Sequence, residues 1–220
     1  MAQIKTNQYS IADDAITLAK MASGTDGNII TYDASGNPAV VASGTSGHFL
    51  KSQGADTVPV FAAAGGGITA ASEWRMNTSF SGSVDPVINW SNSNNAGYGT
   101  IGSNMSESSG VFTFPSTGIW WIFFHANFDD ADASPQTSMH NYIQTTVDNG
   151  SNWVLGANGR ASYTGSNARH SSECTFMFDV TDTSNCKVAF KIDIGGTTDN
   201  TLGASNLHET WAAFIRLGDT

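Results

Sequence analysis

The sequence predicts a mainly β protein whose larger, C-terminal part is an antiparallel sandwich. Ser, Thr, Asn and Gly make up 90 of the 220 residues and only 13% are charged, an uncharged and turn-rich composition unlike that of a helical bundle. Several segments beyond residue 68 alternate apolar and polar side chains with the period of two expected of half-buried strands. Two short Gly-rich units before residue 62 repeat the pattern of a small hairpin.

The charge balance argues against two classes of partner, nucleic acids and anionic membranes. The net charge is −10, and the nine basic residues form no patch, whereas nucleic-acid binders and anionic-membrane binders need Lys/Arg patches. No apolar run reaches the roughly 18 residues of a membrane-spanning helix, and the first residues lack the apolar stretch of a signal peptide. We therefore expect a protein made in a cytoplasm, with no nucleic-acid partner and no membrane insertion.

The first predicted element is a helix over residues 4–22. Ser10 is a plausible capping residue, and Gly24 stands where the helix should end. Ile11 and Leu18 lie seven residues apart on a thin apolar seam that is too short to hold a coiled coil alone. The seam could lie in an oligomer interface through these two residues or on a partner protein, and an amphipathic helix packed on its own domain is the alternative.

An internal duplication follows in residues 24–62. Gly-Thr-Asp-Gly at 24–27 and Gly-Thr-Ser-Gly at 44–47 each begin a unit of turn, short strand, turn and short strand. An isolated hairpin is marginally stable in water, and repeats of this kind gain stability by stacking on further copies. We expect neighbouring chains to supply the missing surface.

A glycine run divides the chain. Residues 65–67 are three consecutive glycines, whose conformational freedom suits a hinge. We therefore expect three parts: an N-terminal stem of one helix and two hairpins (residues 1–64), the hinge (65–67) and a β head (68–220).

Alternation predicts most strands of the head. Residues 173–180 and 186–194 keep the same parity across a turn, which predicts a half-buried hairpin with Cys174 and Cys186 as buried thiols on its apolar face. A second hairpin is predicted between residues 142 and 161, turned at Asp-Asn-Gly. In the last strand, the positions of Trp211, Ala213, Ile215 and Leu217 form the apolar face.

One strand, residues 118–128, is apolar on both faces. Ile119, Trp121 and Phe123 form one row, and Trp120 begins the other. The protein's own core can cover only one row, and in an antiparallel sandwich a neighbouring subunit is the natural cover for the second. We expect an oligomer interface on Ile119, Trp121 and Phe123.

A motif before this strand adds a resemblance. Gly110, Phe112, Pro115 and Gly118, followed by the aromatic strand, resemble the signature of the complement globular head, which belongs with the tumour-necrosis-factor-like trimeric jelly rolls. The final strand, which runs almost to the C-terminus, is similar. The resemblance covers about residues 70–220 and implies that the head is an antiparallel jelly-roll sandwich in a homotrimer.

The N-terminal part carries a second resemblance. Residues 12–22 and the two Gly-Thr-x-Gly units are similar to segments of bacteriophage tail fibres and other virion appendages, over roughly residues 10–62. Together the two resemblances imply a short trimeric appendage of a virion, assembled in the host cytoplasm. The stem would attach to other virion proteins, and the head would project outward.

No metal, cofactor or catalytic motif is recognised. The five histidines lack metal-ligand spacing, and no nucleophile elbow, HExxH helix or phosphate loop is present. Asp129, Asp130 and Asp132 concentrate carboxylates that would suit calcium, which some members of the resembled head family bind. The spacing is not that of an EF-hand, and a solvated acidic loop is favoured. We expect no enzyme, no cofactor and no metal.

Three aromatic residues among small polar ones are candidates for surface recognition. Tyr98, Trp153 and Tyr163 lie in or beside Gly/Ser/Asn-rich loops, where aromatics contact carbohydrate or protein. The alternative is that each packs beneath its own loop.

The resulting hypothesis is a phage tail-fibre protein whose head attaches to a host surface glycan or protein. The first alternative is a capsid decoration protein, a head fibre that binds and stabilises the shell. A glycan-cleaving tailspike is a third possibility from another class.

Overall fold

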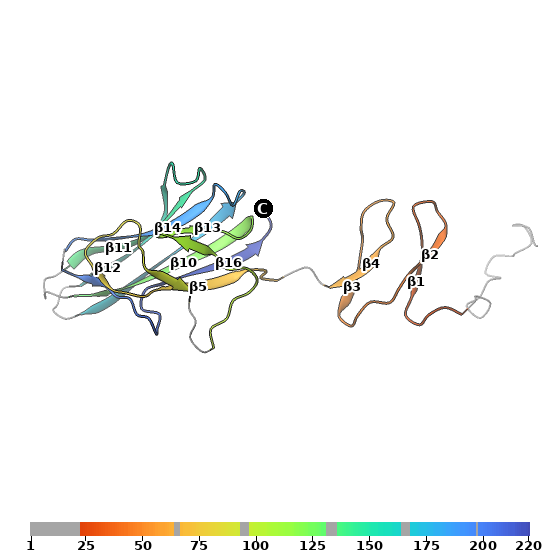
Figure 1. Cartoon of the computed structure of the whole chain (residues 1–220), viewed down its shortest axis with the longest axis horizontal. Coiled ribbons are helices and arrows are strands. Elements are labelled where there is room, and N and C mark those ends of the chain that lie inside the picture. Colours follow the sequence, from red (N-terminus) through yellow and green to blue (C-terminus); the bar gives the residue numbers. More distant parts are fainter. Residues whose placement is uncertain (1–22, 64–66, 93–96, 131–135, 164–167, 197) are drawn as a thin grey trace, which may run out of the picture. The chain divides into compact units, whose positions relative to one another are not determined.

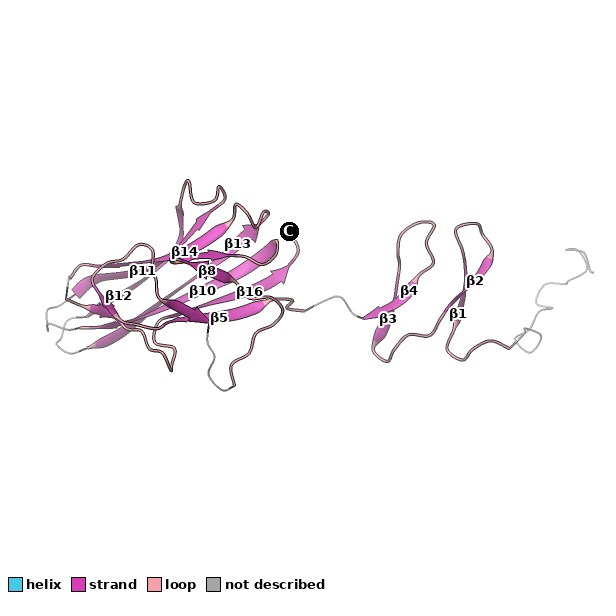
Figure 2. Ribbon diagram, in the orientation of Figure 1, coloured by secondary structure: helices cyan, strands magenta, loops and turns pink. Residues whose placement is uncertain are grey.

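A computed structural model describes residues 23–63, 67–92, 97–130, 136–163, 168–196 and 198–220. All regular elements in these ranges are strands (Figure 2), and none of them contains a helix long and apolar enough to cross a membrane. The helix predicted over residues 4–22, with Ile11 and Leu18, lies outside the described residues. The chain divides into two compact units, Met1–Gly65 and Gly66–Thr220.

The first unit contains the two hairpins predicted from the duplication (Figure 1). The same turn precedes the first strand of each hairpin, because the amides of Asn28 and His48 donate to the carbonyls of Thr25 and Thr45. The strands are β1 (Ile29–Tyr32), β2 (Pro38–Val41), β3 (His48–Lys51) and β4 (Val60–Ala63). Each turn has a glycine at its third position, with φ of 78° at Gly27 and 87° at Gly47, a conformation that favours glycine.

These hairpins leave large apolar side chains uncovered. Ile30 and Leu50 occupy equivalent positions of the two repeats and are 60% and 48% exposed, and Phe49 is 63% exposed. A two-stranded ribbon has no second layer to cover such residues. One copy of this unit therefore keeps much of its apolar surface in water.

The second unit, which we call the head, consists of two packed antiparallel sheets (Figure 1). The seven-stranded sheet contains β5 (Ala71–Met76), β6 (Phe80–Ser81), β7 (Trp90–Asn92), β10 (Gly118–Asp129), β13 (Arg169–Val180), β15 (Asn200–Thr201) and β16 (Trp211–Gly218). The five-stranded sheet contains β8 (Ser106–Ser108), β9 (Val111–Thr113), β11 (Gln136–Thr146), β12 (Val154–Tyr163) and β14 (Lys187–Ile194). This architecture confirms the predicted mainly β sandwich.

Strand β10 lies at the centre of the seven-stranded sheet. It pairs along its whole length with β13 on one side and with β16 on the other, and β16 pairs with β5. The five-stranded sheet has the order β12-β11-β14-β9-β8. The inward row of β10 therefore meets the inward rows of β9, β11 and β14 in one core.

Aromatic side chains fill that core. Trp120, Phe124 and Phe128 of β10 are buried, and so are Phe112, Phe190 and Phe214 from three other strands. Phe124 lies 4.5 Å from Phe190 between ring centroids, in the range of favourable aromatic pairs. The inward row predicted for the segment 118–128 is thus confirmed.

The segments 173–180 and 186–194 do not form the predicted hairpin. Both alternate as expected, with Val180 and Phe190 buried, but β13 pairs with β10 in one sheet and β14 pairs with β11 in the other. The turn between them, held by the Cys186 amide donating to the carbonyl of Asp182 at 2.8 Å, carries the chain from one sheet to the other. Alternation shows only that one face of a segment is buried. Two such segments joined by a turn can pair as a hairpin, or they can lie in the two facing sheets of a sandwich.

The hairpin of β11 and β12 forms as predicted. In its turn, Asn149 and Gly150 have φ of 56° and 88°. Such turns need a positive φ at both central residues, and an Asn-Gly pair tolerates it.

The last strand is apolar on both faces, in contrast to the one-sided pattern that we expected. Ala212 and Phe214 face the core and are fully buried, while Trp211 and Ile215 lie in the outward row. The one-sided prediction was wrong because Ala212 and Ala213 lie on opposite faces and are the same residue. This pair therefore does not distinguish the core face from the outward face.

The glycines of the recognised motif have structural roles. A Cβ atom on Gly110 would lie 2.6 Å from the carbonyl oxygen of Val87, and one on Gly118 would lie 2.4 Å from that of Gly218. Both residues also have positive φ, 86° and 135°. Any side chain at either position would force the backbone apart.

Candidate functional site

The outward side of the seven-stranded sheet carries a contiguous apolar surface, which we call the outer aromatic face. Strand pairing aligns its members in rows, with Trp121 between Met177 and Ile215 and with Phe123 beside Ala213. The face comprises Ile119, Trp121, Phe123, Met177, Trp211, Ala213 and Ile215. Trp121 of β10 is 43% exposed and Met177 of β13 is 62% exposed, so the described residues cover this side of the sheet only in part.

A shallow groove of about 200 Å³ runs over this face. Phe123 stacks on Trp211 with ring centroids 4.8 Å apart, and Trp121 and Ile215 line the same groove together with Glu73. The stacked geometry is in the range of favourable aromatic pairs, and it places both rings side by side on the face.

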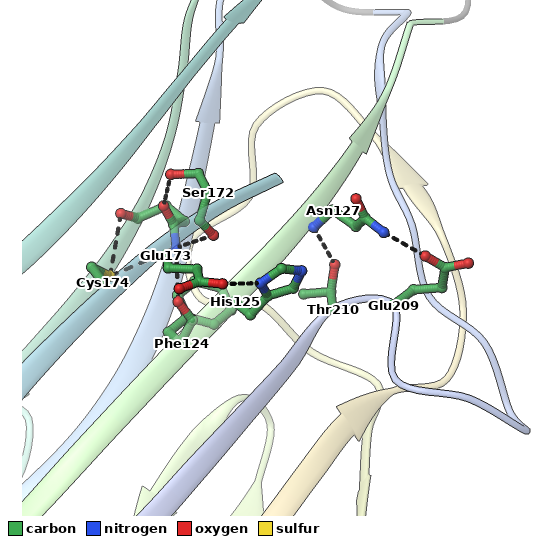
Figure 3. Close-up of polar contacts among 9 residues, drawn as sticks. Phe124, His125, Asn127, Ser172, Glu173, Cys174, Glu209 and Thr210 are labelled. Carbon is green, nitrogen blue, oxygen red and sulfur yellow. Dashed lines mark hydrogen bonds and ion pairs between the residues drawn. The ribbon is translucent and has the colours of Figure 1, made fainter. Parts of the chain in front are cut away.

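Polar pairs border one end of the face (Figure 3). His125 Nδ1 lies 3.1 Å from Glu173 Oε1, and the Asn127 side-chain amide donates to Glu209 at 2.6 Å. The backbone amide of Asn127 also donates to Thr210 Oγ1 at 3.1 Å. An apolar centre with a polar border is the composition of a protein–protein interface.

Tyr98, the first recognition candidate, is folded against the edge of this face. Its hydroxyl donates to the carbonyl oxygen of Glu73 and accepts from the amide of the same residue, both at 2.5 Å. Burial raises the pKa of Tyr98. The ring is therefore held on β5 and does not stand free in its loop.

Tyr163, the second candidate, lies in the interior. It is 3% exposed, its hydroxyl donates to Asp199 at 2.6 Å and its ring stacks on His170. Burial, with Asp199 next in effect, raises the pKa of Tyr163. Tyr163 therefore fits the alternative prediction, that the residue packs beneath its own loop, and not the prediction of surface recognition.

Trp153, the third candidate, lies at a groove on the opposite side of the sandwich. The groove measures about 200 Å³ and is lined by Asp85, Pro86, Val111, Gln144, Trp153 and Ala189. Tyr98 borders a different groove, whose lining includes Ser72 and Glu73, whereas the groove beside Trp153 belongs to the five-stranded sheet and the segment next to it.

Comparison with known proteins addresses the fold of the head. No family model matches the chain, and no curated protein matches its sequence. Among solved structures, Eiger TNF from S. frugiperda is similar with a TM-score of 0.52 and 11% identity, over 68% of this chain and 93% of that one. Murine APRIL at pH 5.0 has a TM-score of 0.50 and 14% identity, over 67% of this chain and 98% of that one. The head is a TNF-like jelly roll.

The acidic segment of the TNF-like head is engaged within the protein. Asp129 accepts from Arg169 Nε at 3.1 Å, and Asp130 is buried. Asp132 lies outside the described residues. Among the residues that the structure describes, no group of three His, Cys, Asp or Glu side chains is placed to hold a metal ion.

The two cysteines are buried free thiols of the TNF-like core. Burial raises the pKa of Cys174 to about 12, so this thiol is protonated at neutral pH and a poor nucleophile.

Sequence reasoning missed four of the seven residues of the outer aromatic face. The predicted core-facing row of the last strand contained Trp211, Ala213 and Ile215, and the alternation of residues 173–180 places Met177 opposite the apolar face of Cys174. The usable signal was Phe214, a large apolar residue on the supposed polar face of the last strand. Strands with apolar residues on both faces, 118–128 and 211–217, lie side by side in the TNF-like head.

Proposed function

We propose that the chain is the protomer of a homotrimeric bacteriophage fibre whose TNF-like head attaches to the host cell surface. The observation that carries the proposal is the outer aromatic face. Proteins that stay monomeric in water rarely expose a contiguous apolar surface of this kind. A face of Trp, Phe, Ile and Met with a polar border is instead typical of the centre of an interface.

The number of three copies rests on the resemblance of the Gly110–Gly118 motif to trimeric jelly rolls. In a closed ring about one axis, each copy presents its face to the next, and no apolar edge is left open. Trp121 and Met177 are the most exposed large residues of the face, so they would lose the most contact with water.

The assignment to a virion rests on the N-terminal sequence. The two repeats resemble segments of phage appendages, and their strands keep Ile30, Phe49 and Leu50 exposed. These side chains suit contacts with other copies of the stem or with proteins of the virion. We place the stem at the particle and the head toward the host.

Binding, without catalysis, is the proposed activity. The groups with clearly shifted pKa values, such as Cys174, Tyr163 and Asp148, are engaged in burial or in local hydrogen bonds. Binding by three heads at once raises the overall affinity through effective concentration, so each single contact can be weak.

The experiment is a mass measurement by analytical ultracentrifugation. The whole chain is expected at about three times 23.1 kDa, and the head alone, residues 68–220, is expected to form trimers too. Trp121→Glu should shift the head to single copies, because each interface would bury a carboxylate without a partner. Val147→Glu, at a position that is 66% exposed elsewhere on the head, is the matched control. A wild-type chain that sediments as a monomer would contradict the trimer.

A further inference from the structure

The groove beside Trp153 lies on the outward side of the five-stranded sheet. Gln144 and Ala189 line it, and their neighbours Ile143 and Phe190 are fully buried in the core, so the groove residues point away from the core. The outer aromatic face lies on the other sheet. The groove and that face are therefore separate surfaces of one copy.

A fixed turn holds Trp153 in place. Asp148 accepts hydrogen bonds from the Asn152 amide at 2.9 Å, from the Asn152 side chain at 2.6 Å and from Thr146 Oγ1 at 2.6 Å. These contacts close the segment that leads directly into Trp153. The indole therefore needs little ordering when a ligand binds, and preorganisation of this kind favours affinity.

The opposite wall is a segment that extends the sheet beside β14. The Val84 amide donates to the carbonyl of Ile192 at 2.9 Å, and that of Val87 donates to the carbonyl of Phe190 at 2.7 Å. The glycine at position 110 lets this segment approach closely. Asp85 and Pro86 are thus fixed across the groove from the indole.

The polar side chains that line the groove are Gln144 and Asp85, and a lysine outside the lining balances the charge of Asp85. Gln144 Nε2 donates to Asp85 Oδ1 at 2.5 Å, and Lys191 Nζ lies 3.3 Å from Asp85 Oδ2. The carboxylate and the ammonium compensate each other. A carboxylate oxygen accepts more than one hydrogen bond, so Asp85 can contact ligand hydroxyls while it keeps both of its partners.

This combination fits one neutral sugar unit. The C–H groups on the face of a pyranose pack on an indole, and its hydroxyls form hydrogen bonds at the ring edge. A phosphate or a carboxylated sugar would instead need a cation without a partner, and Lys191 is paired. The volume of about 200 Å³ is below that of drug-sized sites.

We propose that this groove binds a neutral sugar residue of a surface polysaccharide, with Trp153 as the stacking platform and Gln144 and Asp85 as the hydrogen-bonding groups. The inference rests on the proposed attachment function and names its site and ligand class.

The test is saturation-transfer NMR of the whole chain with methyl glycosides of glucose, galactose, mannose and N-acetylglucosamine. At least one glycoside should bind, and Trp153→Ala should weaken it by about tenfold or more. Gln144→Met, which keeps the side-chain length, should weaken it by about fivefold. Val147→Ala in the same hairpin is the control and should bind like the wild type, and thermal unfolding verifies that each variant is folded.

Three outcomes would overturn the site: no glycoside binds, the Trp153→Ala chain binds as the wild type does, or sialic acid competes more strongly than any neutral glycoside. Attachment to host cells separates this inference from the proposed function. Attachment that is unchanged in Trp153→Ala contradicts the site alone. A wild-type chain that binds a glycoside through Trp153 but fails to attach to host cells supports the site and contradicts the attachment function.

Discussion

At the scale of single residues, Asp148 shows how one side chain fixes a local structure. The hydroxyl of Thr146, followed by the side chain and amide of Asn152, lowers the pKa of Asp148 to about 2 from its ordinary 3.8. These donors favour the charged carboxylate. The same contacts define the turn that presents Trp153, so the charge of Asp148 supports the groove.

The sign of the pH effect follows from this shift. Because the pKa of Asp148 is lower in the folded state, its contribution to stability is present above about pH 4 and is lost as the pH falls toward 2. Asp148→Asn should therefore lower the urea midpoint at pH 7, and the difference from the wild type should shrink between pH 4 and pH 2. Urea unfolding at a series of pH values measures it. A difference that stays constant through this range would contradict the assignment.

At the scale of elements, the closure of the sandwich depends on Gly159 of β12. A Cβ atom there would lie 2.4 Å from Asn141 Oδ1 and 2.4 Å from the carbonyl oxygen of Glu173. Asn141 is fully buried and bridges the two sheets, because its amide donates to the carbonyl of Phe124 and its Oδ1 accepts from Ser172 Oγ. Figure 3 shows Ser172 and Phe124 in this region. The strand edges approach closely because position 159 has no side chain.

Gly159→Ala should destabilise the head by about 1–3 kcal/mol, the range for overpacking of a filled interior. The methyl group would displace Asn141 and weaken a bridge between the sheets. Gly99→Ala, where an added Cβ meets nothing within 4 Å, is the matched control and should change stability by less than about 0.5 kcal/mol. Thermal or urea unfolding distinguishes the two, and equal effects would argue against close packing at position 159.

At the scale of the whole molecule, the head separates two surfaces by the thickness of the sandwich. Association would use the outer aromatic face of one sheet, and a ligand would use the groove beside Trp153 on the other sheet. A trimer would carry three grooves, and several trimers on a particle would multiply weak contacts. This arrangement is what a multivalent attachment fibre needs.

At this scale we predict where the protein lies on the phage particle. Gold-labelled antibody against residues 68–220 should decorate the tail of phage particles in electron micrographs. Label on the capsid, together with particle breakage when the gene is deleted, would instead identify a decoration protein. Host polysaccharide incubated with the chain should keep its length, and shortening would contradict the assignment as a binding protein.

The sequence by itself determined the local features. Period-two alternation located the strands of the head, Asn149-Gly150 and the repeated Gly27 and Gly47 marked turns that need positive φ, and the two-faced row of 118–128 predicted an uncovered surface. These features depend on neighbouring residues along the chain, so they can be read from a pattern.

Only the tertiary structure decided which strands pair and which side chains meet. It placed β13 and β14 in different sheets, put Tyr163 in the interior and brought Asp85, Gln144 and Trp153 to one groove. The physical reason is that pairing and burial follow from contacts between residues far apart in sequence. Alternation specifies that a face is buried, but not what covers it.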